Sequence, residues 1–127
     1  MHVRWRWWLV AAATVTVPVY AGTAWHHVAG RELPTMFIDH ELADSVHYAY
    51  RFHGDGTISG FNMGKKLQGV WHIAGDEICW TLKRRRAEEE CFELERNGAS
   101  IRLLRDGQPA FIATLKPIRQ SATETGR

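Results

Sequence analysis

The two cysteines are the residues whose spacing points most directly to chemistry. Cys79 and Cys91 lie twelve positions apart, one beside a tryptophan and the other beside a phenylalanine. If residues 84–86 form a hairpin tip, the cysteines face each other on the side away from Trp80 and Phe92, within reach of a disulfide. Such a loop would stabilise the domain by about 3 kcal/mol in the chain-entropy model. A redox or metal pair is the alternative, but the sequence has neither a C-x-x-C spacing nor a further cysteine.

Histidines on expected strands form a second candidate site. His53 could meet Asp55 or, across the sheet, His72, and together they would offer two or three ligands to zinc or copper. His47 shares a face with His53 but stands roughly 20 Å along it, so these two cannot bind one ion. The alternative is that all are ordinary surface histidines. We expect no resident metal or other cofactor, and His53, His72 and Asp55 are the candidates if a metal binds.

Two of the six tryptophans, Trp71 and Trp80, fall on core-facing strand positions. Inside a small barrel they could line a ligand cup, as in small lipid or pigment carriers. The alternative is that they fill the interior, which is the more frequent use of such residues in a short chain. Trp71 and Trp80 are therefore the candidate ligand-lining residues.

The sequence offers no recognisable catalytic arrangement. Ser45, Ser59 and Ser100 have no surrounding G-x-S-x-G elbow. The acidic pair Asp76-Glu77 falls in a turn, where aspartate is expected for backbone hydrogen bonding. Phosphate loops and dinucleotide fingerprints are also absent from the sequence. We therefore predict that the protein is not an enzyme and name no catalytic residue.

The elements that would position these residues alternate with a period of two from Val46 onward. Turn signals such as Gly54-Asp55-Gly56, Asn97-Gly98 and Asp106-Gly107 separate them. Seven strands are expected, at residues 47–53, 57–61, 68–73, 78–82, 90–95, 101–104 and 110–116. A sheet with open edges aggregates, so the meander must curl or pair its edges. The predicted fold class is all-β, an antiparallel meander curled into a small barrel or half-barrel, with one disulfide and an N-terminal signal or anchor helix.

The N-terminus has the features of an export signal. Arg4 and Arg6 precede an uncharged run, and small residues stand before Gly22. Cleavage is expected after Ala21, with Ala24 as the next site. An uncleaved anchor reaching about residue 25 is the alternative, because the uncharged run nears the length of a membrane span. The rest of the chain is then periplasmic or secreted, or held at the inner membrane by that anchor.

One small domain is expected after a leader at residues 1–21. We assign a tether with a possible short helix to residues 22–45, the β domain to 46–118 and a disordered tail to 119–127. Phe37, Ile38 and Leu42 recur at roughly helical spacing, which predicts one or two helical turns within 34–43.

The charges of the mature chain balance. Without the leader it carries 14 basic and 14 acidic side chains, which gives no electrostatic case for binding nucleic acid or an anionic membrane surface. Membrane contact is expected only through the N-terminal segment if it stays uncleaved. Three arginines at 84–86 and three glutamates at 88–90 could form a binding patch, but a solvated, salt-bridged loop is the better interpretation.

Several short motifs carry a resemblance. They are D-G-T-x-x-G from Asp55, G-x-W from Gly69, G-D-x-x-C-W from Gly75, Cys91-Phe92, and the later N-G and D-G pairs. From about residue 33 to 116 their order resembles a group of small exported bacterial β domains of unassigned function, and this likeness implies a structural cysteine pair. The G-x-W strand and one-disulfide hairpin are more weakly similar to small periplasmic β-barrel inhibitors of secreted metalloproteases. That likeness implies that the mature N-terminus, residues 22–33 with Trp25 and His26-His27, enters a protease cleft.

These observations favour an exported, non-catalytic binding or accessory domain that contacts a protein partner. An exposed sheet edge or the N-terminal segment would make that contact. A protease-inhibitor-like barrel is one alternative. A carrier of a small ligand or metal is the other, with the ligand beside Trp71 and Trp80 or the metal at His53 and His72.

Overall fold

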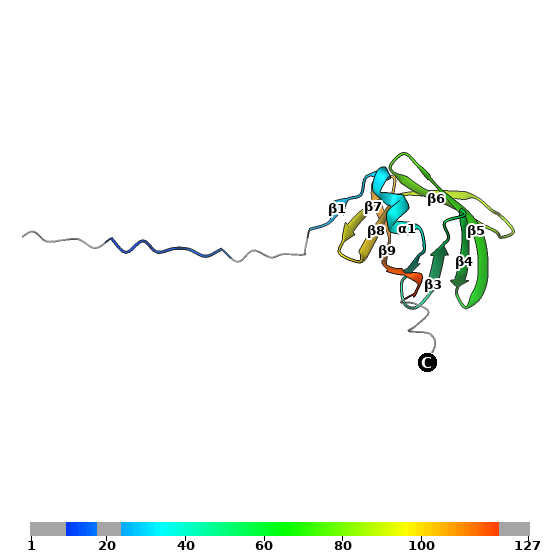
Figure 1. The fold of residues 1–127 in the computed structure, drawn as a ribbon, viewed down its shortest axis with the longest axis horizontal. Helices are drawn as coiled ribbons and strands as arrows, with labels where there is room; N and C mark the ends of the chain where they lie inside the picture. The colour runs from blue at the N-terminus through cyan, green and yellow to red at the C-terminus, as the bar shows by residue number, and fades with distance from the viewer. Residues whose placement is uncertain (1–9, 18–23, 120–127) are drawn as a thin grey trace, which may run out of the picture.

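The computed structural model describes residues 10–17 and 24–119, and its main body is a closed antiparallel barrel (Figure 1). A short strand, β1 (His26–His27), a 3-10 helix, η1 (Gly30–Glu32), and a helix, α1 (Leu33–Phe37), precede it. The barrel strands are β2 (His40–Ala43), β3 (Tyr48–Phe52), β4 (Thr57–Asn62), β5 (Lys65–Ala74), β6 (Glu77–Leu82), β7 (Glu89–Asn97), β8 (Ser100–Arg105) and β9 (Gln108–Pro117). The predicted all-β barrel is confirmed.

The turn signals of the sequence join consecutive strands as expected. Asn97-Gly98 connects β7 to β8, and Asp106-Gly107 connects β8 to β9. Gly98 and Gly107 have φ angles of 62° and 74°, which glycine adopts without a steric penalty. Each of the seven predicted strands is therefore present, although β5 and β7 are longer than the alternation indicates.

The strand β2 is the main correction to the sequence prediction. The helix expected within 34–43 ends with α1 at Phe37, and the chain then turns through Asp39, whose φ is 58°. β2 pairs with β3 on one side and with β9 on the other, so it closes the barrel. Leu42 faces the core while Glu41 faces outward. The edges of β3 and β9 both need hydrogen-bond partners, and this requirement outweighs the weak helical spacing of residues 40–43. The barrel therefore begins before the expected start at Val46.

Side chains alternate between the barrel interior and its outer face. Ile78, Trp80 and Phe92 point inward and are buried. Cys79 and Cys91 are direct cross-strand partners of β6 and β7 and form the predicted disulfide on the outer face. The disulfide therefore links two barrel strands on the side away from Trp80 and Phe92, where neighbouring side chains cover Cys79 and leave it 1% exposed.

The segment before β2 covers one end of the barrel. β1 pairs with the C-terminal half of β7, and the Gly30 N–H donates to Asp76 Oδ1 at 2.7 Å. A Cβ atom on Gly30 would collide with the carbonyl of Gly75, so only glycine allows this approach. The side chains of Leu33 and Phe37 are fully buried in the core. Part of the expected tether is thus a plug that seals this end of the barrel.

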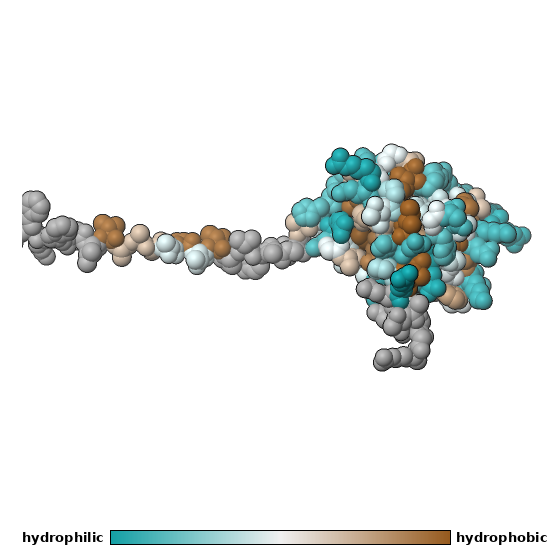
Figure 2. Space-filling model, in the orientation of Figure 1, coloured by the Kyte–Doolittle hydropathy of each residue, from teal (hydrophilic) through white to brown (hydrophobic). Residues whose placement is uncertain are grey.

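The ends of the chain lie largely outside the described residues. Of the expected leader, residues 10–17 are described and form no helix, and their valines are exposed (Figure 2). Five β-branched residues in this stretch and the lack of a packing surface disfavour a helix there. No helix among the described residues is both long and apolar enough to span a membrane. The expected cleavage sites and, apart from Arg119, the expected tail fall mostly in residues that the structure does not describe.

Candidate functional site

The end of the barrel opposite α1 is open. Four turns surround it, those that join β2 to β3, β4 to β5, β6 to β7 and β8 to β9. Between them lies a cavity of about 220 Å³. Its lining residues come from strands all around the barrel and from the β6–β7 loop: Leu42, Tyr48, Tyr50, Asn62, Trp80, Leu82, Arg84, Glu90, Leu103 and Phe111. Alternate residues of each strand point inward, which is why residues so far apart in the sequence meet here.

Aromatic rings form much of the wall of this cavity. The ring centroids of Tyr48 and Tyr50 are 4.9 Å apart, and the Tyr50 and Trp80 rings meet edge to face at 6.0 Å. Phe111 packs edge to face on Tyr48 at 6.4 Å. Phe92, behind Trp80, has its ring centroid 4.8 Å away. Rings that pack on one another in this way hold a firm, apolar surface around a small space.

A few polar groups interrupt the apolar wall. The Asn62 side-chain amide donates to the Tyr50 hydroxyl at 3.0 Å. Glu90 at the mouth forms an ion pair with Arg105 at 3.1 Å. Arg84 also lines the cavity and is exposed to solvent. An apolar pocket with a few polar groups at defined positions is the usual form of a small-molecule site.

Both tyrosines of the cavity stay protonated far above neutral pH. Burial, together with the negative charge of Asp44, raises the pKa of Tyr48 to about 12. Burial and the nearby Glu90 also raise the pKa of Tyr50. The Tyr50 oxygen accepts a bond from Asn62, so its own hydrogen can still be donated to a ligand.

Asp44 fixes the turn that carries Tyr48. Its Oδ1 atom accepts the backbone N–H groups of Val46, His47 and Tyr48 at 3.0, 2.7 and 3.0 Å. Its Oδ2 atom lies 2.7 Å from Nδ1 of His47. Burial alone would raise the pKa of Asp44, but these bonds outweigh it and hold the pKa well below its usual range. The sequence analysis missed this residue, although an aspartate that starts a turn is the pattern that signals such bonding.

Of the two tryptophans predicted to line a cup, only Trp80 does so. Trp71 lies toward the plugged end, where its ring meets Phe52 edge to face at 5.6 Å. Its indole Nε1–H donates to the carbonyl of His53 at 2.9 Å. Trp71 therefore packs in the interior and is held by this hydrogen bond. Beside Trp80, the cavity wall contains Tyr48, Tyr50 and Phe111 in place of Trp71.

The structure gives His53 and Asp55 local partners. His53 Nε2 lies 2.7 Å from the Ser59 hydroxyl oxygen. Asp55 Oδ1 accepts from both the N–H and the hydroxyl of Thr57, and these bonds lower its pKa. The clusters of three or more potential metal ligands found among the described residues contain neither of them. Asp55 is thus a turn-stabilising residue, and His53 does not join His72 in such a cluster.

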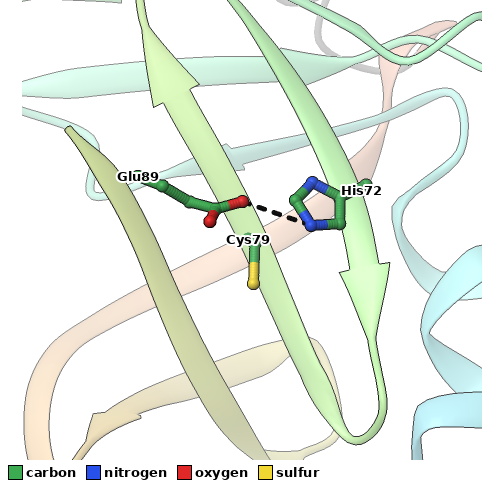
Figure 3. A group of neighbouring side chains, drawn as sticks. All are labelled: His72, Cys79 and Glu89. Atoms are coloured by element: carbon green, nitrogen blue, oxygen red, sulfur yellow. Dashed lines mark ion pairs between the residues drawn. The ribbon is translucent and has the colours of Figure 1, made fainter. Parts of the chain in front are cut away.

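His72 instead has ligand-type neighbours on its own side of the barrel. Its Nε2 atom lies 3.2 Å from Oε1 of Glu89, and the two side chains meet over β6 above Cys79 (Figure 3). One ligand atom from each of these three residues lies within 4.8 Å of the others. Sequence analysis named His72 and Cys79 separately, but Glu89 was counted only as part of a charged loop.

The charged loop between β6 and β7 is exposed, as predicted, but its opposite charges do not pair with each other. Among the ion pairs of the described residues, Glu89 binds His72 and Glu90 binds Arg105. Arg84 stands at the cavity mouth. The expected cross-loop salt bridges are therefore replaced by pairs that reach neighbouring strands.

Part of the segment that the inhibitor likeness assigns to a protease cleft is docked on the barrel. The Val28 N–H donates to the carbonyl of Leu94 at 2.9 Å, and the Val28 side chain is buried. The guanidinium of Arg102 lies 4.5 Å from the centroid of the Trp25 ring. Insertion of this segment into a cleft would require these contacts to break.

No protein-family model matches the chain, and comparison with curated proteins and with solved structures finds no match. The two likenesses indicated by the motifs stay predictions, and the case for function is made from the geometry of the barrel itself.

Proposed function

We propose that this domain binds a small apolar molecule with an acidic group in the open end of its barrel. The observation that carries the proposal is the aromatic-walled cavity between the four turns. A binding role of this kind agrees with the ligand-carrier alternative of the sequence analysis. Ligand binding would also explain why the rings of Tyr48 and Phe111 stay half exposed, which core packing alone does not explain.

The volume of the cavity limits the size of the ligand. At about 220 Å³ it is larger than the engineered cavity of about 150 Å³ that holds benzene. It is smaller than the pockets of about 300 Å³ and more that hold drug-sized molecules. One ring or a short alkyl chain suits this space.

The charges at the mouth favour an anionic group on the ligand. Glu90 is paired with Arg105, which leaves the positive charge of Arg84 beside the cavity. Arginine binds carboxylates through two parallel N–H donors. The Tyr50 hydroxyl adds an uncharged donor deeper in the wall. A carboxylic acid with a short apolar chain would fit the apolar cavity, the positive charge of Arg84 and the Tyr50 donor together.

Calorimetric titration of the full chain with octanoic acid and with octanol tests this proposal. The two probes share a chain length and differ in charge. We expect octanoate to bind with a Kd on the order of 10 μM, which is within the range available to so few atoms. Leu82→Trp, which fills the cavity, should abolish binding of both probes, whereas Val70→Trp on the outer face should leave it intact.

The acidic group is tested by a second pair of variants. Arg84→Gln should weaken octanoate about fivefold, the range of a solvent-exposed ion pair, and should leave octanol unchanged. Arg85→Gln, in the same loop but outside the cavity wall, is the control. If neither probe binds the wild-type chain, the cavity is not a ligand site. If both bind but Arg84→Gln has no effect, the site takes uncharged ligands.

A protein partner is the second candidate. Each barrel strand is paired on both sides over at least part of its length, so none of β2 to β9 is an edge strand of the sheet. Val46 and Met63, on turns of the open end, nevertheless expose 80% and 71% of their surface. Exposed apolar side chains on turns favour contact with another protein. Val46→Glu with Met63→Glu should then remove a partner that co-purifies with the wild-type chain while octanoate binding persists.

A further inference from the structure

The outer face of β5, β6 and β7 carries a row of side chains able to bind a metal. His72, Cys79 and Cys91 are cross-strand partners in register on these three strands. Glu89 extends over β6 from the other side, and its carboxylate meets the His72 ring above Cys79 (Figure 3). Nitrogen, sulfur and carboxylate donors thus converge on one point outside the barrel wall.

The potential ligand atoms form two overlapping groups that share Cys79. One atom each of His72, Cys79 and Glu89 lies within 4.8 Å of the others, and the same holds for Glu77, Cys79 and Cys91. Ligands bound to zinc at about 2.0 to 2.3 Å stand roughly 3.3 to 3.8 Å from one another. The side chains of His72 and Glu89 are 56% and 50% exposed, so small side-chain rotations can bring their ligand atoms closer together, to the spacing that zinc requires.

The disulfide decides whether this site exists. While Cys79 and Cys91 are bonded to each other, neither offers the thiolate that a metal binds. Reduction would free the Cys79 thiol beside the imidazole of His72 and the carboxylate of Glu89, and the Cys91 thiol next to that of Cys79. Two cysteines, one histidine and one carboxylate make a complete donor set for zinc.

We propose that reduction of the Cys79–Cys91 disulfide creates a zinc-type site formed by Cys79, Cys91, His72 and Glu89. A dithiol reductant supplies two electrons and two protons to the disulfide and is itself oxidised to a disulfide. The metal then displaces one proton from each thiol and binds the two thiolates, neutral His72 and ionised Glu89. The site lies outside the barrel wall, so it is independent of the ligand cavity.

Cobalt(II) titration of the full chain, after reduction with a phosphine and without oxygen, tests the proposal. We expect one cobalt per chain, with a thiolate charge-transfer band and the strong visible bands of tetrahedral coordination. The oxidised chain should show neither. His72→Ala should weaken binding by at least about tenfold and Glu89→Gln by less, whereas His53→Ala and Glu93→Gln should have no effect.

A thermal measurement covers the case in which reduction loosens the barrel. Zinc should raise the Tm of the reduced wild-type chain and raise that of reduced His72→Ala by clearly less at the same zinc concentration. A cobalt affinity that is unchanged in His72→Ala, a reduced chain that binds no cobalt, or a reduced chain that zinc does not stabilise would each overturn the proposal.

Discussion

The two ends of the barrel differ in what covers them. At the plugged end Leu33 and Phe37 are fully buried, and the rings of Phe37 and Phe52 meet edge to face at 4.9 Å. At the open end Tyr48 and Phe111 line a cavity and stay partly exposed. The side chains that stabilise the fold and those that could bind a ligand are thus separated along the barrel axis. Changes at one end should affect stability and changes at the other should affect binding.

Phe37→Ala should have the largest effect on stability. Removing this fully buried ring leaves a void against Phe52 and should lower the free energy of unfolding by about 3 to 5 kcal/mol. Phe111→Ala, at the open end, should cost about 1 kcal/mol, because 41% of that residue is already exposed. Denaturant unfolding of both variants measures the contrast. Equal losses would show that the two ends share one packed core.

The disulfide should contribute to stability without affecting the cavity. Replacing Cys79 and Cys91 together by alanine should lower the free energy of unfolding by about 3 kcal/mol, since their loop no longer restricts the unfolded chain. The Kd for octanoate should stay within about twofold, because both side chains point away from the cavity that Trp80 lines. Urea unfolding and calorimetry on the same protein check both parts. A large loss of octanoate binding would place the disulfide among the residues that shape the cavity.

Alternation and turn dipeptides were sufficient to predict most of the barrel. They located the strands from Tyr48 onward and the Cys79–Cys91 pair, because both depend on local periodicity and on the position of one hairpin tip. They could not locate β2, since residues 40–43 become a strand only through pairing with β3 and β9, which are distant in sequence. Local spacing carries no information about such closure.

The candidate site was only partly predictable for the same reason. Trp80 was identified from its inward position, but the register that sets Tyr48 and Phe111 around it is a property of the closed barrel. The pairing of His72 with Glu89 depends on side chains that reach across an intervening strand. His72 lies on β5 and His53 directly follows β3, close to where the sequence places them, but the side chains that they contact could not be predicted from the strand face alone.

Asp44 tests how the open end is held in shape. Asp44→Ala removes the acceptor of three backbone N–H groups and should cost about 1 to 2 kcal/mol at neutral pH. The pKa of Asp44 is depressed in the folded chain, so its contribution is present above the unfolded value of about 3.9 and is lost as pH falls through the folded value. The stability difference between wild type and variant should therefore shrink in acid. A constant difference from pH 7 to pH 2 would rule out an ionic role.

Tyr48 should give the smallest effect, seen only in alkali. Its pKa of about 12 lies above the unfolded value of about 10. Its protonated hydroxyl therefore stabilises the fold fully below about pH 10, and this contribution is lost as pH rises through about 12. Ultraviolet titration of wild type and Tyr48→Phe isolates this residue. Ionisation near pH 10 would show that the open end leaves the hydroxyl solvated.

The two core tryptophans provide the most direct test of the central claim, because one lies at each end of the interior. Trp80 lines the cavity, whereas the Trp71 indole N–H is bound to the His53 carbonyl toward the plugged end. In nitrogen-labelled full-length protein, titration with octanoate should shift the indole signal of Trp80 and leave that of Trp71 in place. A shift of Trp71 alone, or no shift of either signal at saturating octanoate, would contradict a ligand site in the open end of the barrel.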